Sequence, residues 1–177
     1  MKFAGVVLAG GQSKRMGVDK SQLTIGNYTL LQHAKKILSD SELSDIFVSG
    51  QQGIRDEFES LGPIGGILTC LSTLKTFEYV FFLPVDMPFV TPDMIKTLKN
   101  HVDKPIVHFK NNNLPLMIKN DDNVRRKIKN NIDKNLLSLY QLNEELNGKE
   151  LESNFNNDQF INTNTPDQWQ NAKIKFS

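Results

Sequence analysis

The feature that most constrains the fold of this chain is a regular alternation of two patterns within its first hundred residues. Short runs rich in β-forming residues alternate with stretches in which apolar residues recur at helical spacing. The strand-like runs are Phe3–Leu8, Ile46–Ser49 and Tyr79–Leu83, and the helix-like stretches are Leu30–Leu38, Ile64–Leu74 and the segment opened by Thr91-Pro92-Asp93. This alternation predicts an α/β fold in three layers, with a mostly parallel central sheet and helices on both faces.

The second part of the chain carries weaker signals, and we expect it to complete the same domain. Two apolar runs, Pro105–Phe109 and Leu114–Ile118, flank Asn111-Asn112-Asn113 and predict a β-hairpin. Further along, the patterns predict helices over Val124–Ile128, over Leu136–Leu146 and after Thr165-Pro166-Asp167, and a last strand at Phe160-Ile161. We therefore expect a single domain over residues 1–177, with residues 1–100 and 101–177 as its two halves.

Composition narrows the class of function. A length of 177 residues corresponds to about one domain, and 21 Lys and Arg against 20 Asp and Glu argue against a nucleic-acid binder. One cysteine cannot build a disulfide framework or a thiolate metal cage within the chain. The apolar start breaks at Gly10-Gly11, and no apolar run approaches the ~18–20 residues of a membrane span. We expect a cytoplasmic protein without a membrane contact.

A glycine-containing, basic loop follows the first predicted strand. It reads LAGGQSKRMGVDK, residues Leu8–Lys20, and carries Lys14, Arg15 and Lys20. Glycine permits close backbone approach, so that successive N–H groups can point at an anion, and the cations add forked and mobile charge. The loop matches neither the Walker A nor the dinucleotide-binding spacing. It predicts a triphosphate site, although an ordinary turn with solvated charges would also account for it.

Three other segments carry polar groups suited to ligand binding. Asp86 lies in Pro84–Phe89, directly after the most apolar run, where a carboxylate can hold Mg²⁺ or simply cap a turn. Gly62–Gly66 opens a helix whose amides could bind an anion or a base edge, and Asn162–Pro166 offers amides to a neutral ligand. Ligands of such sheets bind outside the carboxyl ends of the strands, so the first loop and the Asp86 loop should meet there.

Other reactive residue types fit structural roles. The histidines His33, His101 and His108 lack metal-ligand spacing and are expected at the surface or partly packed. Cys70 falls on an apolar helix face and is expected in the core. The run Arg125-Arg126-Lys127 with Lys129 predicts a solvated helix face.

The motifs together resemble those of the molybdenum cofactor guanylyltransferase (MobA) family. The resemblance rests on Leu8–Gly17 with Asp19-Lys20, then Gly62-Pro63, Asp86-Met87-Pro88 and Asn162–Pro166 in the same order. It implies a Rossmann-like nucleotidyltransferase domain. The cytidylyl relatives tend to have Ala-Ala-Gly in the first loop, so Ala9-Gly10-Gly11 favours GTP over CTP. The chain departs from the family pattern at Ser49–Gln52 and at Asn113–Leu116.

The resemblance also implies roles for individual residues. It implies that Arg15, Lys20 and Asp86 are catalytic, that Asp86 binds Mg²⁺, and that Asn162 and Asn164 contact the acceptor. The GTP site that it implies comprises Leu8, Ala9, Gly10, Gly11, Ser13, Arg15, Lys20, Asp56, Gly62, Gly65 and Asp86.

The implied reaction is transfer of GMP from GTP to the terminal phosphate of molybdenum-loaded molybdopterin, which yields a guanine dinucleotide cofactor and pyrophosphate. A phosphate nucleophile is already anionic at neutral pH, so positioning and charge neutralisation are the main requirements. Transient contacts with molybdopterin-insertion proteins or apo-molybdoenzymes fit this reading. Two alternatives stay open: a cytidylyl- or sugar-1-phosphate nucleotidyltransferase, and a non-catalytic nucleotide- or pterin-cofactor-binding protein.

Overall fold

The computed structural model describes residues 1–10, 20–58 and 60–176, and within them six strands form one central sheet. The strand order is β4–β1–β5–β7–β6–β8. The strands are β1 (Phe3–Leu8), β4 (Asp45–Ser49), β5 (Tyr79–Pro84), β6 (Ile106–Phe109), β7 (Asn112–Lys119) and β8 (Lys149–Leu151). A separate two-stranded sheet pairs β2 (Thr24–Ile25) with β3 (Tyr28–Thr29).

Within the central sheet, the strands of residues 1–100, the half expected to bind the nucleotide, pair in parallel with one another. The second half adds an antiparallel strand to the sheet. β1 pairs in parallel with both β4 and β5, and β6 pairs in parallel with β8. β7 runs antiparallel to its two neighbours, β5 and β6, because the predicted hairpin forms at residues 106–119. The carboxyl ends of β1, β4, β5 and β6 therefore share one edge of the sheet, whereas β7 begins there.

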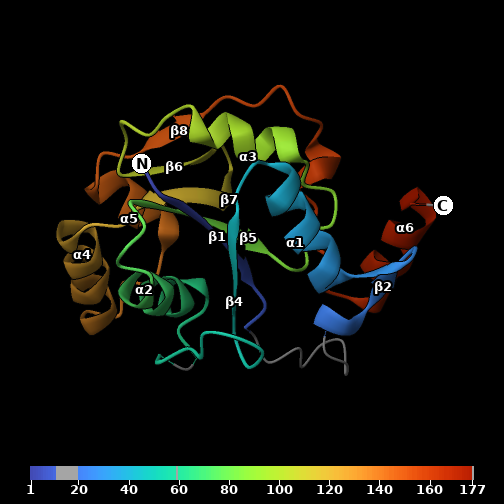
Figure 1. Cartoon of the computed structure of the whole chain (residues 1–177), viewed down its shortest axis with the longest axis horizontal. Coiled ribbons are helices and arrows are strands. Elements are labelled where there is room, and N and C mark those ends of the chain that lie inside the picture. Colours follow the sequence, from blue (N-terminus) through green and yellow to red (C-terminus); the bar gives the residue numbers. More distant parts are fainter. Residues whose placement is uncertain (11–19, 59, 177) are drawn as a thin grey trace.

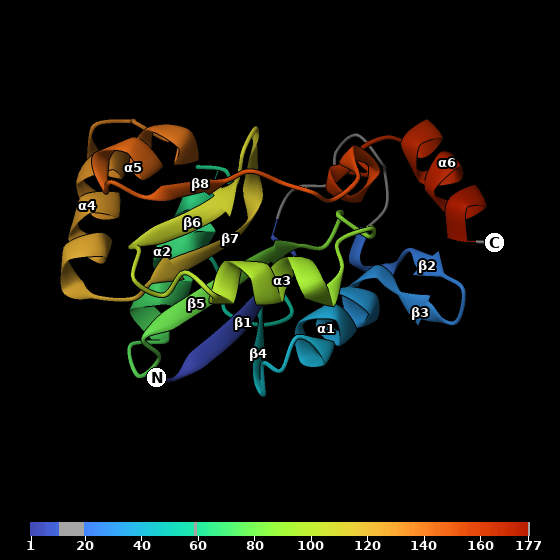
Figure 2. The ribbon, with the colours of Figure 1, turned by 90° about the horizontal axis from the view of Figure 1, so that it is seen from above.

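Helices cover both faces of the sheet, as the alternation predicted (Figures 1 and 2). One face carries α2 (Pro63–Thr73), α4 (Asp122–Asp133) and α5 (Leu139–Glu145), and the other carries α1 (Leu30–Asp40) and α3 (Pro92–Lys99). The last helix, α6 (Pro166–Phe176), lies beside the β2–β3 pair in both views, with buried Trp169 anchoring it. Two short 3₁₀ helices, η1 (Lys20–Gln22) and η2 (Asn157–Phe160), complete the elements.

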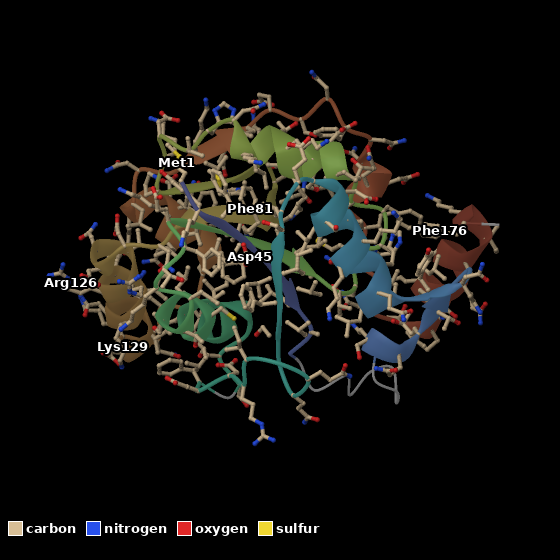
Figure 3. All side chains as sticks on the ribbon, in the orientation of Figure 1. Met1, Asp45, Phe81, Arg126, Lys129 and Phe176 are labelled. Atoms are coloured by element: carbon tan, nitrogen blue, oxygen red, sulfur yellow. The ribbon has the colours of Figure 1, made fainter. Side chains whose placement is uncertain are left out.

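The central strand β5 explains why both faces are covered. All six of its residues are buried, and Phe81 and Phe82 belong to the two different apolar clusters. Alternate side chains of a strand point to opposite faces, so each phenylalanine supplies the core of one layer (Phe81 is labelled in Figure 3). Full burial of such a side chain contributes about 1.5–3 kcal/mol to folding.

Two expectations from the sequence were wrong. Phe160-Ile161 does not form a strand: Asn156 and Gln159 cap each other's backbone around η2, and Phe160 packs edge-on against Phe109. The reciprocal cap closes a turn that an extended chain could not make. His108 is not at the surface but 2% exposed, on a strand buried along its whole length.

The helices of the described residues are short. The longest is α4, with 12 residues, and none has both the length and the apolarity that crossing a membrane requires.

Candidate active site

The described ends of the first loop, Leu8–Gly10 and Lys20, meet the Asp86 loop at the carboxyl edge of the sheet, as expected for segments that leave neighbouring strands. Lys20 opens η1 at the far end of the first loop, and Asp86 follows β5 by two residues. The Lys20 Nζ lies 3.0 Å from Asp86 Oδ2, and the two side chains are 14% and 19% exposed. A pair this well covered is screened less by solvent than a surface ion pair.

The segment before α6 joins the same site. Lys20 Nζ also donates to Asn164 Oδ1 at 2.5 Å. The neighbouring Thr163 is fully buried, and its N–H and Oγ1 both donate to the Asp86 carbonyl, at 2.8 and 3.2 Å. These two bonds fix the backbone of Asp86 to the segment that carries Asn164. The structure therefore brings together Lys20, Asp86 and Asn164, three of the residues to which the sequence assigned roles.

Backbone contacts hold the ends of three strands together beneath these side chains. Leu8 O accepts from Val85 N at 3.1 Å, which ties β1 to the Asp86 loop. Ala9 N donates to Ser49 O at 3.0 Å and is therefore committed to the neighbouring strand rather than to a ligand. A Cβ on Gly50, whose φ is +123°, would lie 2.9 Å from Gly10 N, so this position requires glycine.

Gly50 had no role assigned from the sequence, where Ser49–Gln52 stood out only as a departure from the family pattern. The signal available was a glycine directly after a predicted strand, which often marks close backbone approach. The side chain of Gln52 also reaches Ser21 in η1, with Nε2 3.3 Å from Oγ. The turn after β4 therefore supports the described ends of the first loop.

The turn before α2 and the start of that helix contain Asp56, Gly62 and Gly65, three residues of the implied GTP site. Asp56 Oδ1 accepts from Phe58 N at 2.8 Å and from Thr69 Oγ1 at 3.2 Å, so this oxygen stabilises the turn. Gly62 is the N-cap of α2 at φ +65°, and a Cβ on Gly65 would lie 2.8 Å from Phe58 O. In the structure these residues therefore shape the turn and the start of α2, and their contact with GTP stays a prediction.

Part of the predicted phosphate site lies outside the described residues. Gly11, Ser13 and Arg15 fall in residues 11–19, and their predicted roles stay as predictions. Asn162 is exposed and does not take part in the Lys20 contacts, unlike Asn164.

Asn162 instead lines a hollow of about 260 Å³ next to the Lys20–Asp86 pair. Its other described lining residues are Met87, Asn111–Leu114 and Phe160. We call it the tip pocket, because Asn111–Asn113 is the tip of the β6–β7 hairpin. A second hollow, of about 280 Å³, lies at the opposite edge around Met1–Phe3. Ligands of open α/β sheets bind at the carboxyl edge, which favours the tip pocket.

The oxygens around Lys20 fit a divalent cation. The ammonium group of Lys20 lies within 3.0 Å of both Asp86 Oδ2 and Asn164 Oδ1, so two oxygens converge on one positive charge. Among the described residues no three His, Cys, Asp or Glu side chains form a metal cluster. A single carboxylate suits Mg²⁺, which completes its shell with phosphate oxygens and water.

The remaining reactive groups serve the fold. Cys70 is fully buried in α2, as predicted, and burial raises the pKa of its thiol to about 11 despite a hydrogen bond with Ser49. The charge run lies on α4, where Lys127 pairs with Glu145 at 3.2 Å, and Arg126 and Lys129 project outward in Figure 3. These groups are therefore not candidates for chemistry.

Known proteins similar to this chain identify its family. The family model described as the MobA-like NTP transferase domain matches residues 5–118. A molybdenum cofactor guanylyltransferase of Xanthomonas euvesicatoria pv. vesicatoria (strain 85-10) is 30% identical over 174 residues, which cover 94% of this chain and 92% of the relative.

Solved structures share the fold across nearly the whole chain. Molybdopterin-guanine dinucleotide biosynthesis protein A from Archaeoglobus fulgidus has a TM-score of 0.75 at 17% identity, covering 97% of each chain. A 2-C-methyl-D-erythritol 4-phosphate cytidylyltransferase from Thermus thermophilus has a TM-score of 0.72 at 14% identity, covering 99% of each. The fold alone therefore does not separate guanylyl from cytidylyl transfer, and the assignment rests on the sequence matches. By the family model and by the full-length relative, the chain belongs to the MobA-like NTP transferase family.

Proposed function

We propose that this protein transfers GMP from GTP to the terminal phosphate of molybdopterin and releases pyrophosphate. The observation that supports the proposal is the Lys20–Asp86 ion pair after the strands β1 and β5, and we propose that its carboxylate binds a metal ion. Similarity to a guanylyltransferase over 94% of the chain supplies the substrates. Since its substrate is GTP, we also propose that the protein acts in the cytoplasm.

The reaction is an in-line displacement at the α-phosphorus of GTP. An oxygen of the acceptor phosphate forms the new P–O bond, the bond to the β-phosphate oxygen breaks, and pyrophosphate leaves with that electron pair. No proton has to be removed from the acceptor, because its phosphate is already anionic at neutral pH. The main barrier is the approach of two anions, so catalysis consists of positioning and charge neutralisation.

The residues of the site meet these two requirements. Lys20 supplies a mobile positive charge that can exchange its contacts with Asp86 and Asn164 for phosphate oxygens. Asp86 would hold a divalent cation, for which we propose Mg²⁺, and a bound Mg²⁺ would neutralise charge on the phosphates. Thr163 fixes the Asp86 backbone, so that its carboxylate stays aimed at the edge of the sheet.

Release of Lys20 from Asn164 would also free an amide oxygen on the acceptor side. The same lysine therefore contacts residues that we assign to both halves of the site. This arrangement suits a two-substrate reaction, because nucleotide binding prepares the segment that meets the acceptor.

The direct test is a transfer assay with purified protein, GTP, molybdopterin and Mg²⁺. We expect pyrophosphate release that depends on the acceptor, together with a guanine dinucleotide product seen by chromatography and mass spectrometry. CTP and a sugar 1-phosphate serve as alternative substrates in parallel reactions. Transfer from CTP in preference to GTP would replace the proposal with cytidylyl transfer, and binding without any transfer would indicate a binding protein.

A further inference from the structure

The tip pocket lies between three segments that are distant in the sequence. One wall is the hairpin tip between β6 and β7, another is Met87, and the third is Phe160 with Asn162 (Figure 2 shows the β6–β7 connection beside the segment that leads from β8 to α6). Met87 directly follows Asp86, and Asn162 directly precedes Thr163, whose backbone is bonded to Asp86. Two of its lining residues are therefore chain neighbours of Asp86 and of Thr163, which is bonded to Asp86, the residue that we propose binds the metal.

The side chains that line the tip pocket are uncharged. Of the described residues that line it, four are asparagines and none carries a charge. Each asparagine amide offers two donors and one acceptor oxygen in a single plane. Met87, Leu114 and Phe160 add apolar surface. Apolar walls with a few polar groups are typical of sites for flat organic ligands, and about 260 Å³ is just below the ~300–1,000 Å³ of drug-sized sites.

The hairpin tip is held in place by hydrogen bonds of its own. The imidazole of His108 is 2% exposed, and its Nδ1 lies 3.0 Å from Phe109 O and 3.1 Å from Asn112 O. Both partners are acceptors, so Nδ1 carries the proton and donates to them. Asn112 Nδ2 donates to Lys110 O at 3.1 Å, and Asn111 adopts φ +63°, which asparagine tolerates better than most residues. A tip fixed in this way loses little entropy on binding.

From the tip pocket we infer that Asn111 and Asn113 determine acceptor specificity by hydrogen-bonding the donor–acceptor edge of a neutral, flat nitrogen heterocycle. This inference rests on the proposed function and names the part of the acceptor that the tip recognises. The edge that fits is a 2-amino-4-oxopyrimidine ring, because planar amides pair with adjacent N–H donors and a carbonyl oxygen in one plane. The heterocycle would lie between the apolar walls, and the phosphate of the acceptor would extend toward Asp86.

The test uses two fluorescent probes that differ in one group. Free pterin carries the 2-amino-4-oxo edge, whereas lumazine has an oxo group in place of the amino group. Each is titrated into the full-length protein, and binding is followed by fluorescence quenching. We expect wild type to bind pterin at least about fivefold more tightly than lumazine, since one neutral hydrogen bond contributes roughly that factor. Equal binding of the two probes would overturn the inference.

Substitutions at the tip have matched controls elsewhere in the chain. Asn113→Ala removes an exposed amide, and Asn111→Gly removes one without disturbing its positive φ. The controls are Asn130→Ala, exposed on α4, and Asn135→Gly, exposed at φ +57°. Each tip variant should weaken pterin binding roughly fivefold and reduce the preference over lumazine, whereas GTP binding and the control variants should match wild type.

The same variants separate this inference from the proposed function. In the transfer assay the tip variants should raise KM for molybdopterin and leave KM for GTP unchanged. If wild type transfers GMP and the tip variants keep its acceptor KM, the inference is wrong and the proposed function stands. If pterin binding depends on the tip but no GMP is transferred, the pocket assignment stands and the proposed function fails.

Discussion

Lys20 and Asp86, 66 residues apart in the sequence, form an ion pair of 3.0 Å that joins η1 to the loop after β5. The pair brings together the lysine that we propose contacts the phosphates and the carboxylate that we propose binds the metal. Because each partner neutralises the other, both charges are tolerated although the side chains are only 14% and 19% exposed. Substitution of Asp86 then tests metal-dependent catalysis, and substitution of Lys20 tests nucleotide binding.

Asp86→Asn should separate catalysis from folding. The asparagine oxygen can still accept from Lys20, so we expect the free energy of unfolding to change by less than ~1 kcal/mol. Turnover should fall by roughly a thousandfold, because a neutral amide holds a hard cation poorly. The measurements are urea unfolding and pyrophosphate release, with the exposed Asp40→Asn as the control, since Asp40 pairs with Lys36 at 2.9 Å. An active but destabilised Asp86→Asn would make this carboxylate structural.

Lys20→Ala should weaken nucleotide binding. A charge-assisted contact to phosphate contributes about 1.5–3 kcal/mol, so we expect the Kd for GTP to rise at least tenfold in calorimetry. Lys36→Ala removes an exposed lysine from another ion pair and should leave the Kd unchanged. Wild-type affinity in the Lys20 variant would show that this lysine does not contact the phosphates.

The site should recognise the guanine base of GTP as well as the triphosphate. We expect GTP with Mg²⁺ to bind roughly tenfold or more tightly than ATP, CTP or UTP, because two or more hydrogen bonds to the guanine edge distinguish it. Thermal shifts at equal nucleotide concentration measure the difference. Since the four nucleotides carry the same triphosphate, equal stabilisation would indicate phosphate recognition alone and would contradict the guanylyl assignment.

Gly50→Ala should damage both stability and nucleotide binding. The new Cβ would lie 2.9 Å from Gly10 N, at a φ of +123°. We expect a loss of about 2–4 kcal/mol in the free energy of unfolding, from strain and overpacking together. Gly26→Ala is the control, because its φ is +55° but no atom lies within 4 Å. It should cost only about 1–2 kcal/mol and leave the Kd for GTP unaltered.

The buried thiol of Cys70 predicts a loss of stability in alkali. Burial raises its pKa from 9.0 to about 11, so between these values the folded state binds more proton than the unfolded state. The free energy of unfolding should therefore be unaffected by this group below about pH 9 and decline as pH rises toward 11. Urea titrations at pH 8 and pH 10 measure the decline. Cys70→Val should show a smaller decline over the same interval, and an equal one would assign the effect to other groups.

Much of the parallel part of the fold could be predicted because its signals are local. The run Tyr79–Leu83 is apolar throughout, and it does form the central strand. The hairpin around Asn111–Asn113 also formed, because two apolar runs were separated by turn-forming residues. The strand β8 was missed, since only one of its three residues is buried and so short a run shows no periodicity.

The site was predictable in its residue types but not in its contacts. Asp86 was singled out because it follows a strand, and Lys20 because it ends a glycine-containing loop; their proximity is confirmed, and their roles stay predictions. The bond from Thr163 to the Asp86 carbonyl depends on the path of residues 152–162, which no local pattern describes. The closeness of Gly50 to Gly10 likewise depends on strand register, which becomes known only when β1 and β4 are paired.

The antiparallel course of β7 has a consequence for how such enzymes diverge. The tip asparagines, Asn111–Asn113, lie in the turn between β6 and β7 and at the start of β7, and neither of these strands pairs with β1. Substitutions or short insertions there leave the pairing of β1 with β4 and β5 intact. Acceptor recognition at the tip, as we propose it, would therefore be able to change during evolution while the pairing of β1 with β4 and β5 stays the same.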